Sequence, residues 1–303
     1  MEIHYLKYEQ INKTKWDACI SRADNGLIYA YSYYLDAMAK HWDALVLNDY
    51  EAVMPLTWNK KYHIHYLYQP PFTACLGVFG HEITAGTVNS FLKAIPATFK
   101  YWDMYFNPGN CFKLPGFSLY QRMNYVLNLN KTYDELYQAY RDNIKRNIKK
   151  AAQFGLTVLK DTPLAPVLQL AKEQAGAFSK MSDDDFSRFE KLFDVLYKKK
   201  QATTYAVYSG NNQLLASAVF FFSNNRACYI LVGNHPNGKT LGASHTLINA
   251  FIKDHAGENM LLDFEGSDIP SLAFFYSSFG AVEERYSAIK LNRLPGLVKW
   301  LKK

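Results

Sequence analysis

One stretch in the second half of the chain, residues 227–252, constrains the fold more than any other. It reads ACYILVGNHPNGKTLGASHTLINAFI. The apolar run 227–232 predicts a buried strand, and apolar residues at helical spacing from Ser244 onward predict an amphipathic helix. The residues between them include glycine, proline and asparagine, which are typical of turns. A strand, a loop and a helix in this order offer backbone N–H groups and a positive helix end to an anion, usually phosphate. The alternative is an ordinary β–α connection in which the glycines only turn the chain.

Length and composition allow one large domain or two of ordinary size, because 49% of the 303 residues are hydrophobic and 20% are charged. We expect no transmembrane segment and no signal peptide, since no apolar run is long enough. The four cysteines are scattered without metal-binding spacing, which favours reduced thiols in a cytoplasmic protein and no metal site. The net charge of +7 suits an anionic partner such as a phosphorylated cofactor, RNA or a membrane surface.

Both halves show the same order of expected elements: helices, a β-hairpin, a third strand, a glycine-bearing loop, a helix and a strand. The first half has expected strands at 44–47, 52–57, 63–68 and 101–106, and helices at 13–23, 31–41 and 87–94. The second half has expected helices at 131–154, 164–178, 186–199 and 270–278, and strands at 203–208, 214–222, 261–264 and 288–291. This order predicts an α/β fold of two domains with mixed sheets. We expect residues 1–128 to form the first domain, 129–291 the second, and 292–303 to return to the first.

The segment 239–244, KTLGAS, resembles the (Arg/Gln)-x-x-Gly-x-(Gly/Ala) loop of the GNAT fold of acyl-CoA N-acyltransferases. Lys239 replaces the Arg or Gln, and Ser244 replaces the last small residue. In that family the backbone amides of the loop hold the pyrophosphate of CoA, so the resemblance implies two tandem GNAT-like domains and an acyl-CoA site. The candidate cofactor-binding residues are Val232, Gly233, Gly238, Lys239, Gly242, Ala243 and Ser244. The amides near Val232 and Gly233 would polarise the acyl carbonyl, and the others would hold phosphate.

Three further segments resemble the FemAB/FemX-like proteins. Residues 140–156 are similar to their "R.NIKKA...GL" segment, and LDFEGS (262–267) and AFFYSSFG (273–280) to their "DF.G" and "Y.FK..FG" segments. These are tandem-GNAT transferases, some of which move an amino acid from aminoacyl-tRNA onto a peptidoglycan precursor. The tRNA-dependent members have a lysine where this chain has Tyr276. We therefore expect acyl-CoA as the donor, with aminoacyl-tRNA as the alternative.

The candidate catalytic residues are Glu265 and Tyr276. Glu265 follows a buried strand at its C-terminal end, where α/β sheets place ligand-contacting residues, and a carboxylate there could deprotonate an amine. Tyr276 is either a proton donor to the leaving thiolate or a core residue. We expect Asp268 to cap the helix that begins at Pro270.

Arg141, Lys145 and Lys149 share one face of a predicted helix. Such a face is either solvated or contacts RNA or a nucleotide diphosphate.

These patterns predict an acyltransferase that acts on an amine acceptor, either a small molecule, a peptide or a cell-wall precursor. Two alternatives belong to other classes. One is a non-catalytic GNAT-like protein with a groove for a peptide or glycan. The other is a dedicated nucleic-acid binder, which rests on charge alone.

Overall fold

The computed structural model describes residues 2–176, 181–266 and 268–294. The described chain divides into two compact units. The first contains residues 2–123 and 285–294, and the second contains 124–284. The chain passes between the units within β7 (Leu119–Asn128) and β13 (Val282–Asn292).

The sheet of the first unit has the strand order β1-β2-β3-β4-β6-β13, and β5 also pairs with β3. Its pairs are antiparallel except for β4 with β6. The strands are β1 (Ile3–Leu6), β2 (His41–Leu47), β3 (Ala52–Lys61), β4 (Ile64–Leu67), β5 (Phe79–Gly80) and β6 (Phe99–Tyr105). The helices are α1 (Lys13–Arg22), α2 (Ser32–Met38) and α3 (Ala85–Ala94), with short 3-10 turns η1 (Tyr8–Gln10), η2 (Ile28–Ala30) and η3 (Pro108–Asn110).

The sheet of the second unit has the order β7-β12-β11-β10-β9-β8, and only β11 and β12 are parallel. The strands are β8 (Thr157–Lys160), β9 (Ala202–Tyr208), β10 (Leu214–Ser223), β11 (Arg226–Asn234) and β12 (Leu261–Asp263). The helices are α4 (Tyr133–Gln138), α5 (Asp142–Gln153), α6 (Leu164–Ala175), α7 (Asp183–Lys198), α8 (Pro236–Leu241), α9 (Ala243–His255) and α10 (Pro270–Ser277).

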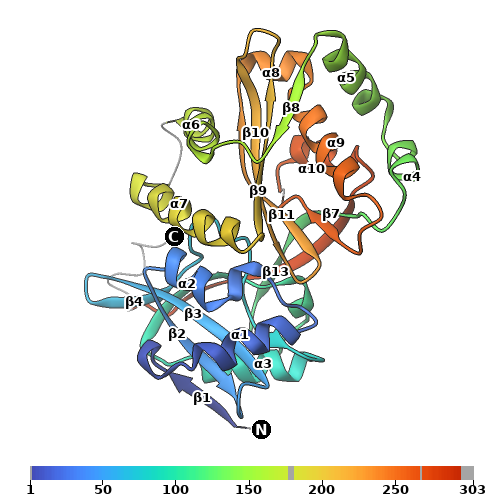
Figure 1. The fold of residues 1–303 in the computed structure, drawn as a ribbon. Helices are drawn as coiled ribbons and strands as arrows, with labels where there is room; N and C mark the ends of the chain where they lie inside the picture. The colour runs from blue at the N-terminus through green and yellow to red at the C-terminus, as the bar shows by residue number, and fades with distance from the viewer. Residues whose placement is uncertain (1, 177–180, 267, 295–303) are drawn as a thin grey trace. The chain divides into compact units, whose positions relative to one another are not determined.

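Helices cover both faces of this second sheet, with α5 and α9 on one side and α6 and α7 on the other (Figure 1). The ring of Phe251 on α9 stacks on Phe220 of β10 at 3.8 Å between centroids. The next residue of the strand, Phe221, faces the opposite side and stacks on Phe189 of α7. Both sides are therefore apolar, which explains why β10 is a continuous apolar run instead of an alternating one.

The mixed α/β fold predicted from the sequence is confirmed, but several elements differ from expectation. The helix predicted over 131–154 is two helices, α4 and α5, separated by residues 139–141. Its predicted start at residue 131 is close to the observed one, since Thr132 is the N-cap of α4 and forms a reciprocal capping box with Glu135. Strands β1, β7 and β8 were not predicted, because each is short or carries polar side chains on both faces.

The predicted return of residues 292–303 to the first unit lies mostly outside the described residues. The described residues 292–294 belong to the first unit, where the N–H of Arg293 donates to the carbonyl of Lys100 on β6 at 2.8 Å.

Candidate functional site

Strand β11 separates from its parallel neighbour halfway along its length. Only Arg226–Cys228 pair with Leu261–Asp263 of β12, whereas β11 continues to Asn234. A β-bulge accompanies this separation: Val219 of β10 lies opposite Leu231 and Phe220 opposite Tyr229, so that Ile230 is the extra residue. A bulge bends a strand and re-aims its backbone groups. The outer half of β11 therefore has an edge that β12 does not cover.

The backbone of β11 directs one of the predicted amides toward this edge. The N–H of His235 donates to the carbonyl of Leu215 on β10 at 2.9 Å. Since alternate N–H groups of an antiparallel strand point to opposite sides, the N–H of Gly233 points toward β10 and that of Val232 points away from it. Val232 is thus the better placed of the two to polarise a carbonyl. Gly233 has a packing role, because a Cβ there would lie 2.8 Å from the backbone nitrogen of Ala171 on α6.

The region predicted as an open loop after β11 is partly helical. Gly233 and Asn234 belong to β11, and residues 236–241 form α8. The side chain of His235 caps α8 by accepting from the N–H of Asn237 at 3.1 Å, and Pro236 occupies the first turn, where no N–H donor is needed. These local features outweigh the low helix propensity of the Pro-Asn-Gly sequence.

Two glycines of the predicted phosphate loop are required by the packing of the backbone around them. A Cβ on Gly238 would collide with the carbonyl oxygen of Leu215. Gly242 joins α8 to α9 with φ +77°, and a Cβ there would lie 2.6 Å from the carbonyl oxygen of Asn147 on α5. Both glycines therefore permit close packing, whether or not a ligand binds nearby.

The remaining loop candidates lie around the start of α9. Ala243 and Ser244 form its first turn, and the hydroxyl of Ser244 hydrogen-bonds the side chain of Asn234. Lys239 is exposed on α8. The N–H groups of a first helical turn and the positive helix end attract anions, so these three residues remain the candidates for a phosphate contact.

The structure brings the two candidate catalytic residues together. Tyr276 on α10 is buried, and its ring stacks on Phe264 at 4.6 Å between centroids. Burial, and then the charge of Glu265, raise the pKa of Tyr276 to about 12, so the phenol keeps its proton at neutral pH. Tyr229 of β11 is a further phenol near Tyr276, and no signal in the sequence pointed to it. Burial, and then the interaction with Tyr276, raise the pKa of Tyr229 well above its usual value.

Asp268 does not play its predicted role. The N-cap of α10 is Ile269, and no side chain caps this helix. Asp268 is exposed and precedes the cap by one residue. Pro270 at the first position needs no N–H partner, which makes a side-chain cap less necessary.

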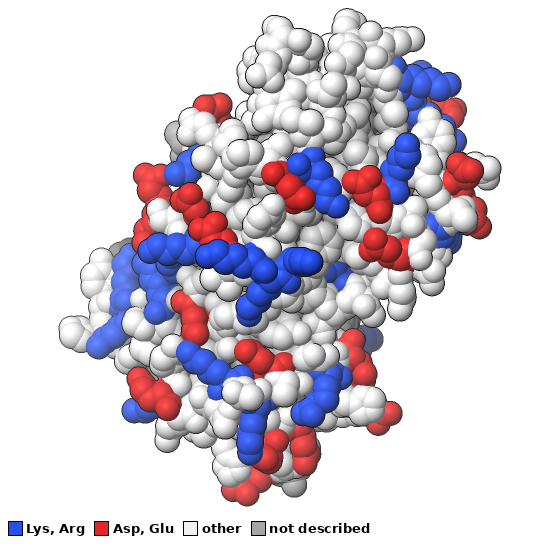
Figure 2. Space-filling model, in the orientation of Figure 1, with Lys and Arg blue, Asp and Glu red and all other residues white. Residues whose placement is uncertain are grey.

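Lys145 and Lys149 of the predicted basic face lie on α5, and Arg141 is the N-cap of this helix. Lysine and arginine side chains are spread over many parts of the face shown in Figure 2. The guanidinium of Arg141 lies over the ring of Phe274 at 4.9 Å. The amine of Lys145 donates to the carbonyl of Gln138 at 3.0 Å. Lys149 is exposed. Two of the three cations thus take part in contacts within the second unit.

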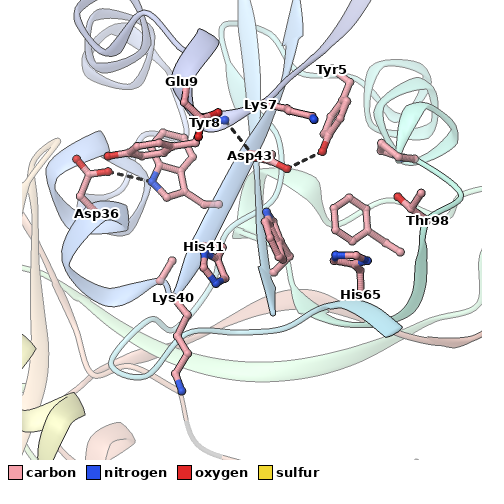
Figure 3. A pocket seen from close by; sticks show the side chains of 15 residues that line it. Tyr5, Lys7, Tyr8, Glu9, Asp36, Lys40, His41, Asp43, His65 and Thr98 are labelled. Atoms are coloured by element: carbon pink, nitrogen blue, oxygen red, sulfur yellow. Dashed lines mark hydrogen bonds between the residues drawn. The ribbon is translucent and has the colours of Figure 1, made fainter. Parts of the chain in front are cut away.

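A cavity of about 610 Å³ in the first unit was not anticipated from the sequence (Figure 3). Its wall includes Trp58, on which His41 stacks at 4.4 Å between centroids, and the amines of Lys7 and Lys40 stand at its edge. The buried carboxylate of Asp43 accepts from the hydroxyl of Tyr5 at 2.5 Å and from the N–H of Tyr8 at 3.1 Å. The remaining lining residues are Glu9, Asp36, Ala39, Trp42, His65, Pro96, Thr98 and Phe99.

Residues 138–268 match the family model of an acetyltransferase (GNAT) domain. This stretch of the chain is therefore similar to a GNAT acetyltransferase domain. The matched residues include α5, all of β11, the start of α9 and Glu265. The expected resemblance to the GNAT fold is thus confirmed. A search of curated proteins found no match.

The fold of the whole chain is shared with solved structures. The crystal structure of FemX superposes with a TM-score of 0.70 at 14% identity, covering 100% of both chains. A conserved protein of unknown function from Bacteroides thetaiotaomicron has a TM-score of 0.63 at 12% identity, covering 96% of this chain and 100% of its own. L-PGS from Bacillus licheniformis has a TM-score of 0.50 at 10% identity, covering 84% and 85%. The GNAT domain therefore belongs to a FemX-like two-unit fold.

Within residues 2–176, 181–266 and 268–294, no group of three or more His, Cys, Asp or Glu side chains is arranged to hold a metal ion. None of the described helices combines the length and the apolar character needed to cross a membrane.

Proposed function

We propose that this protein is an N-acyltransferase that transfers an acyl group from a CoA thioester to a primary amine. The observation that carries the proposal is the separation of β11 from β12 within the GNAT domain, with the N–H of Val232 directed to the uncovered edge. A backbone donor fixed in a strand stabilises the oxyanion that forms when a thioester is attacked. The first turn of α9, which follows the same strand, is placed to attract the phosphates of CoA.

The chemistry assigns one proton transfer to each candidate side chain. The neutral amine nitrogen forms a bond to the thioester carbon, and Glu265 accepts the one proton that this nitrogen loses as the amide forms. The tetrahedral oxyanion is held by the N–H of Val232 and then collapses, breaking the C–S bond. Tyr276 gives its proton to the departing thiolate. Its raised pKa keeps that proton available at neutral pH.

We favour acyl-CoA over aminoacyl-tRNA as the donor because Tyr276 stands where tRNA-dependent FemX-like proteins have lysine. Among the proposed acceptors, an amine on a cell-wall precursor is supported by the shared fold with FemX. None of the four cysteines is in a disulfide, which supports a cytoplasmic location.

The test is a turnover assay with acetyl-CoA, a panel of amine acceptors and detection of released CoA thiol. We expect Glu265→Gln to lower kcat by about 100-fold or more, the usual contribution of a general base, with the KM for acetyl-CoA unchanged. Tyr276→Phe should lower kcat in the same way. Glu258→Gln is the matched control, because Glu258 is a carboxylate of the same unit that pairs with His255. Full activity in both Glu265→Gln and Tyr276→Phe would refute the assignment.

A second candidate function is non-catalytic binding of a glycan or peptide, and the cavity of the first unit favours it. Aromatic side chains such as Trp58 stack on sugar rings, and Lys7 and Lys40 suit acidic groups. A muramyl peptide is a suitable probe for calorimetric titration. Binding that survives Glu265→Gln but is lost in Lys40→Glu, with no turnover of acetyl-CoA, would support this function over the transferase.

A further inference from the structure

A cluster of charged side chains lies beneath the loop that carries Glu265. The Nη1 of Arg226 donates to Oδ2 of Asp263 at 2.6 Å and to Oε2 of Glu284 at 2.8 Å, and its Nη2 donates to Oε1 of Glu284 at 2.9 Å. The Nδ2 of Asn124 donates to Oδ1 of Asp263 at 2.8 Å and to Oε2 of Glu284 at 3.3 Å. The side chains of Arg226 and Asp263 are only 12% and 7% exposed. Burial works to lower the pKa of Arg226, but the two carboxylates outweigh it and raise the pKa above its usual value.

The cluster is connected directly to the backbone of residues 264–266. Oδ1 of Asp263 accepts from the N–H of Glu265 at 2.8 Å, and Oδ1 of Asn124 accepts from the N–H of Gly266 at 2.6 Å. The N–H of Phe264 donates to the carbonyl of Tyr125 at 3.0 Å. The backbone N–H groups of residues 264–266 are therefore all hydrogen-bonded, two of them to the cluster and one to Tyr125, which follows Asn124 on β7.

The conformation of Glu265 explains why such support is needed. Its φ is +57°, in the left-handed region that residues with a Cβ rarely adopt. A non-glycine residue held there costs about 1–3 kcal/mol and persists only when the surrounding structure fixes it. Because a buried ion pair is weak evidence for stability in itself, the bonds to the loop are the more informative feature of this cluster.

We propose that Arg226, Asp263, Glu284 and Asn124 are positioning residues that fix the backbone of Glu265 so that its carboxylate faces Tyr276. This inference rests on the proposed function of Glu265 as the base. Asp263 is the central member, because one carboxylate oxygen holds the loop while the other is bound by Arg226. Asp263 belongs to the "DF.G" segment, which was the only sequence signal for the cluster. The other three members lie far from it in the sequence.

The first test is kinetic and uses a double-mutant cycle. We expect Asp263→Asn to lower kcat by about 10- to 100-fold, as loss of geometry at a reacting group does, with the KM for acetyl-CoA unchanged. In a Glu265→Gln background, Asp263→Asn should have no further effect, because both changes remove the same contribution. Arg226→Lys, which keeps the charge without the guanidinium fork, should restore part of the kcat lost in Arg226→Met. Asp254→Asn is the matched control, since Asp254 accepts from Tyr205 elsewhere in the unit.

The outcomes separate the two proposals. If Glu265→Gln leaves kcat unchanged, the proposed base is wrong. If Glu265→Gln lowers kcat but Asp263→Asn lowers it further by an independent factor, the positioning proposal alone is wrong.

A second test needs no activity. Hydrogen exchange at the amides of Glu265 and Gly266 should accelerate at least about 10-fold in Asp263→Asn, or in the milder Glu284→Gln if the first variant does not fold, while α9 stays protected. Unchanged exchange at these two amides would overturn the proposal.

Discussion

Replacing Gly242 by alanine introduces both backbone strain and a steric clash. The same replacement at Gly155 introduces the backbone strain alone, so comparing the two variants isolates the clash. Gly242 has φ +77°, and a Cβ there would lie 2.6 Å from the carbonyl oxygen of Asn147. An L-residue in the left-handed region costs about 1–2 kcal/mol, and forcing a methyl group into a packed contact costs about 1–3 kcal/mol more. Gly155, after α5, has φ +65° but nothing within 4 Å of a Cβ. Gly155→Ala should therefore lose only the first amount.

The measurement is urea unfolding of Gly242→Ala and Gly155→Ala, both of which lie in the second unit. The losses in the free energy of unfolding can be compared when both variants show the same slope m as the unchanged protein. We expect Gly242→Ala to lose about 1–3 kcal/mol more than Gly155→Ala, the part due to overpacking against α5. Equal losses in the two variants would refute the packing of α5 against this turn. The same reasoning shows that a bulky residue at Gly242 is a poor probe of CoA binding, because it disturbs the helix contact as well.

Three further predictions concern the same unit. Arg226→Met should lower the free energy of unfolding by about 3–5 kcal/mol, since it leaves the buried carboxylate of Asp263 and the partly buried carboxylate of Glu284 without their cation; a loss below 1 kcal/mol in urea unfolding would contradict this. Burial lowers the pKa of His245 from 6.5 to about 4. The unfolded chain therefore binds the extra proton in this range, so stability should be full above about pH 6.5 and fall as the pH drops toward 4, and His245→Gln should reduce that fall in pH-dependent thermal unfolding. Gly233→Ala should cost about 1–3 kcal/mol through overpacking against α6, and an unchanged urea midpoint would contradict it.

The local sequence was sufficient for features that depend on neighbouring residues. The apolar run of β11 and the capping box at Thr132 both follow from nearby side chains. Glu265 became a candidate because it follows a predicted buried strand, and Tyr276 because it lies in a segment that resembles a FemAB/FemX-like motif.

Features that depend on distant contacts could not be predicted in this way. Helix α8 packs closely on β10, where a Cβ on Gly238 would collide with the carbonyl oxygen of Leu215, and this distant contact is not visible in a propensity pattern. Strand β7 mixes polar and apolar residues without strict alternation, and only three of its ten residues are buried. The partners of Asp263 come from β7 and β11, and Glu284 of β13 joins the cluster through Arg226, so that only the folded sheet brings these residues together.

The central claim, an acyl-CoA site at the start of α9, is tested most directly by calorimetric titration with acetyl-CoA and CoA. Ser244→Asp and Ser244→Asn form a matched pair that differs in one negative charge within the first turn, where a carboxylate does not harm the helix. We predict micromolar binding to the unchanged protein, at least about a 10-fold weaker affinity in Ser244→Asp because of repulsion from phosphate, and little change in Ser244→Asn. No binding at millimolar CoA, or equal affinities in the two variants, would contradict the account.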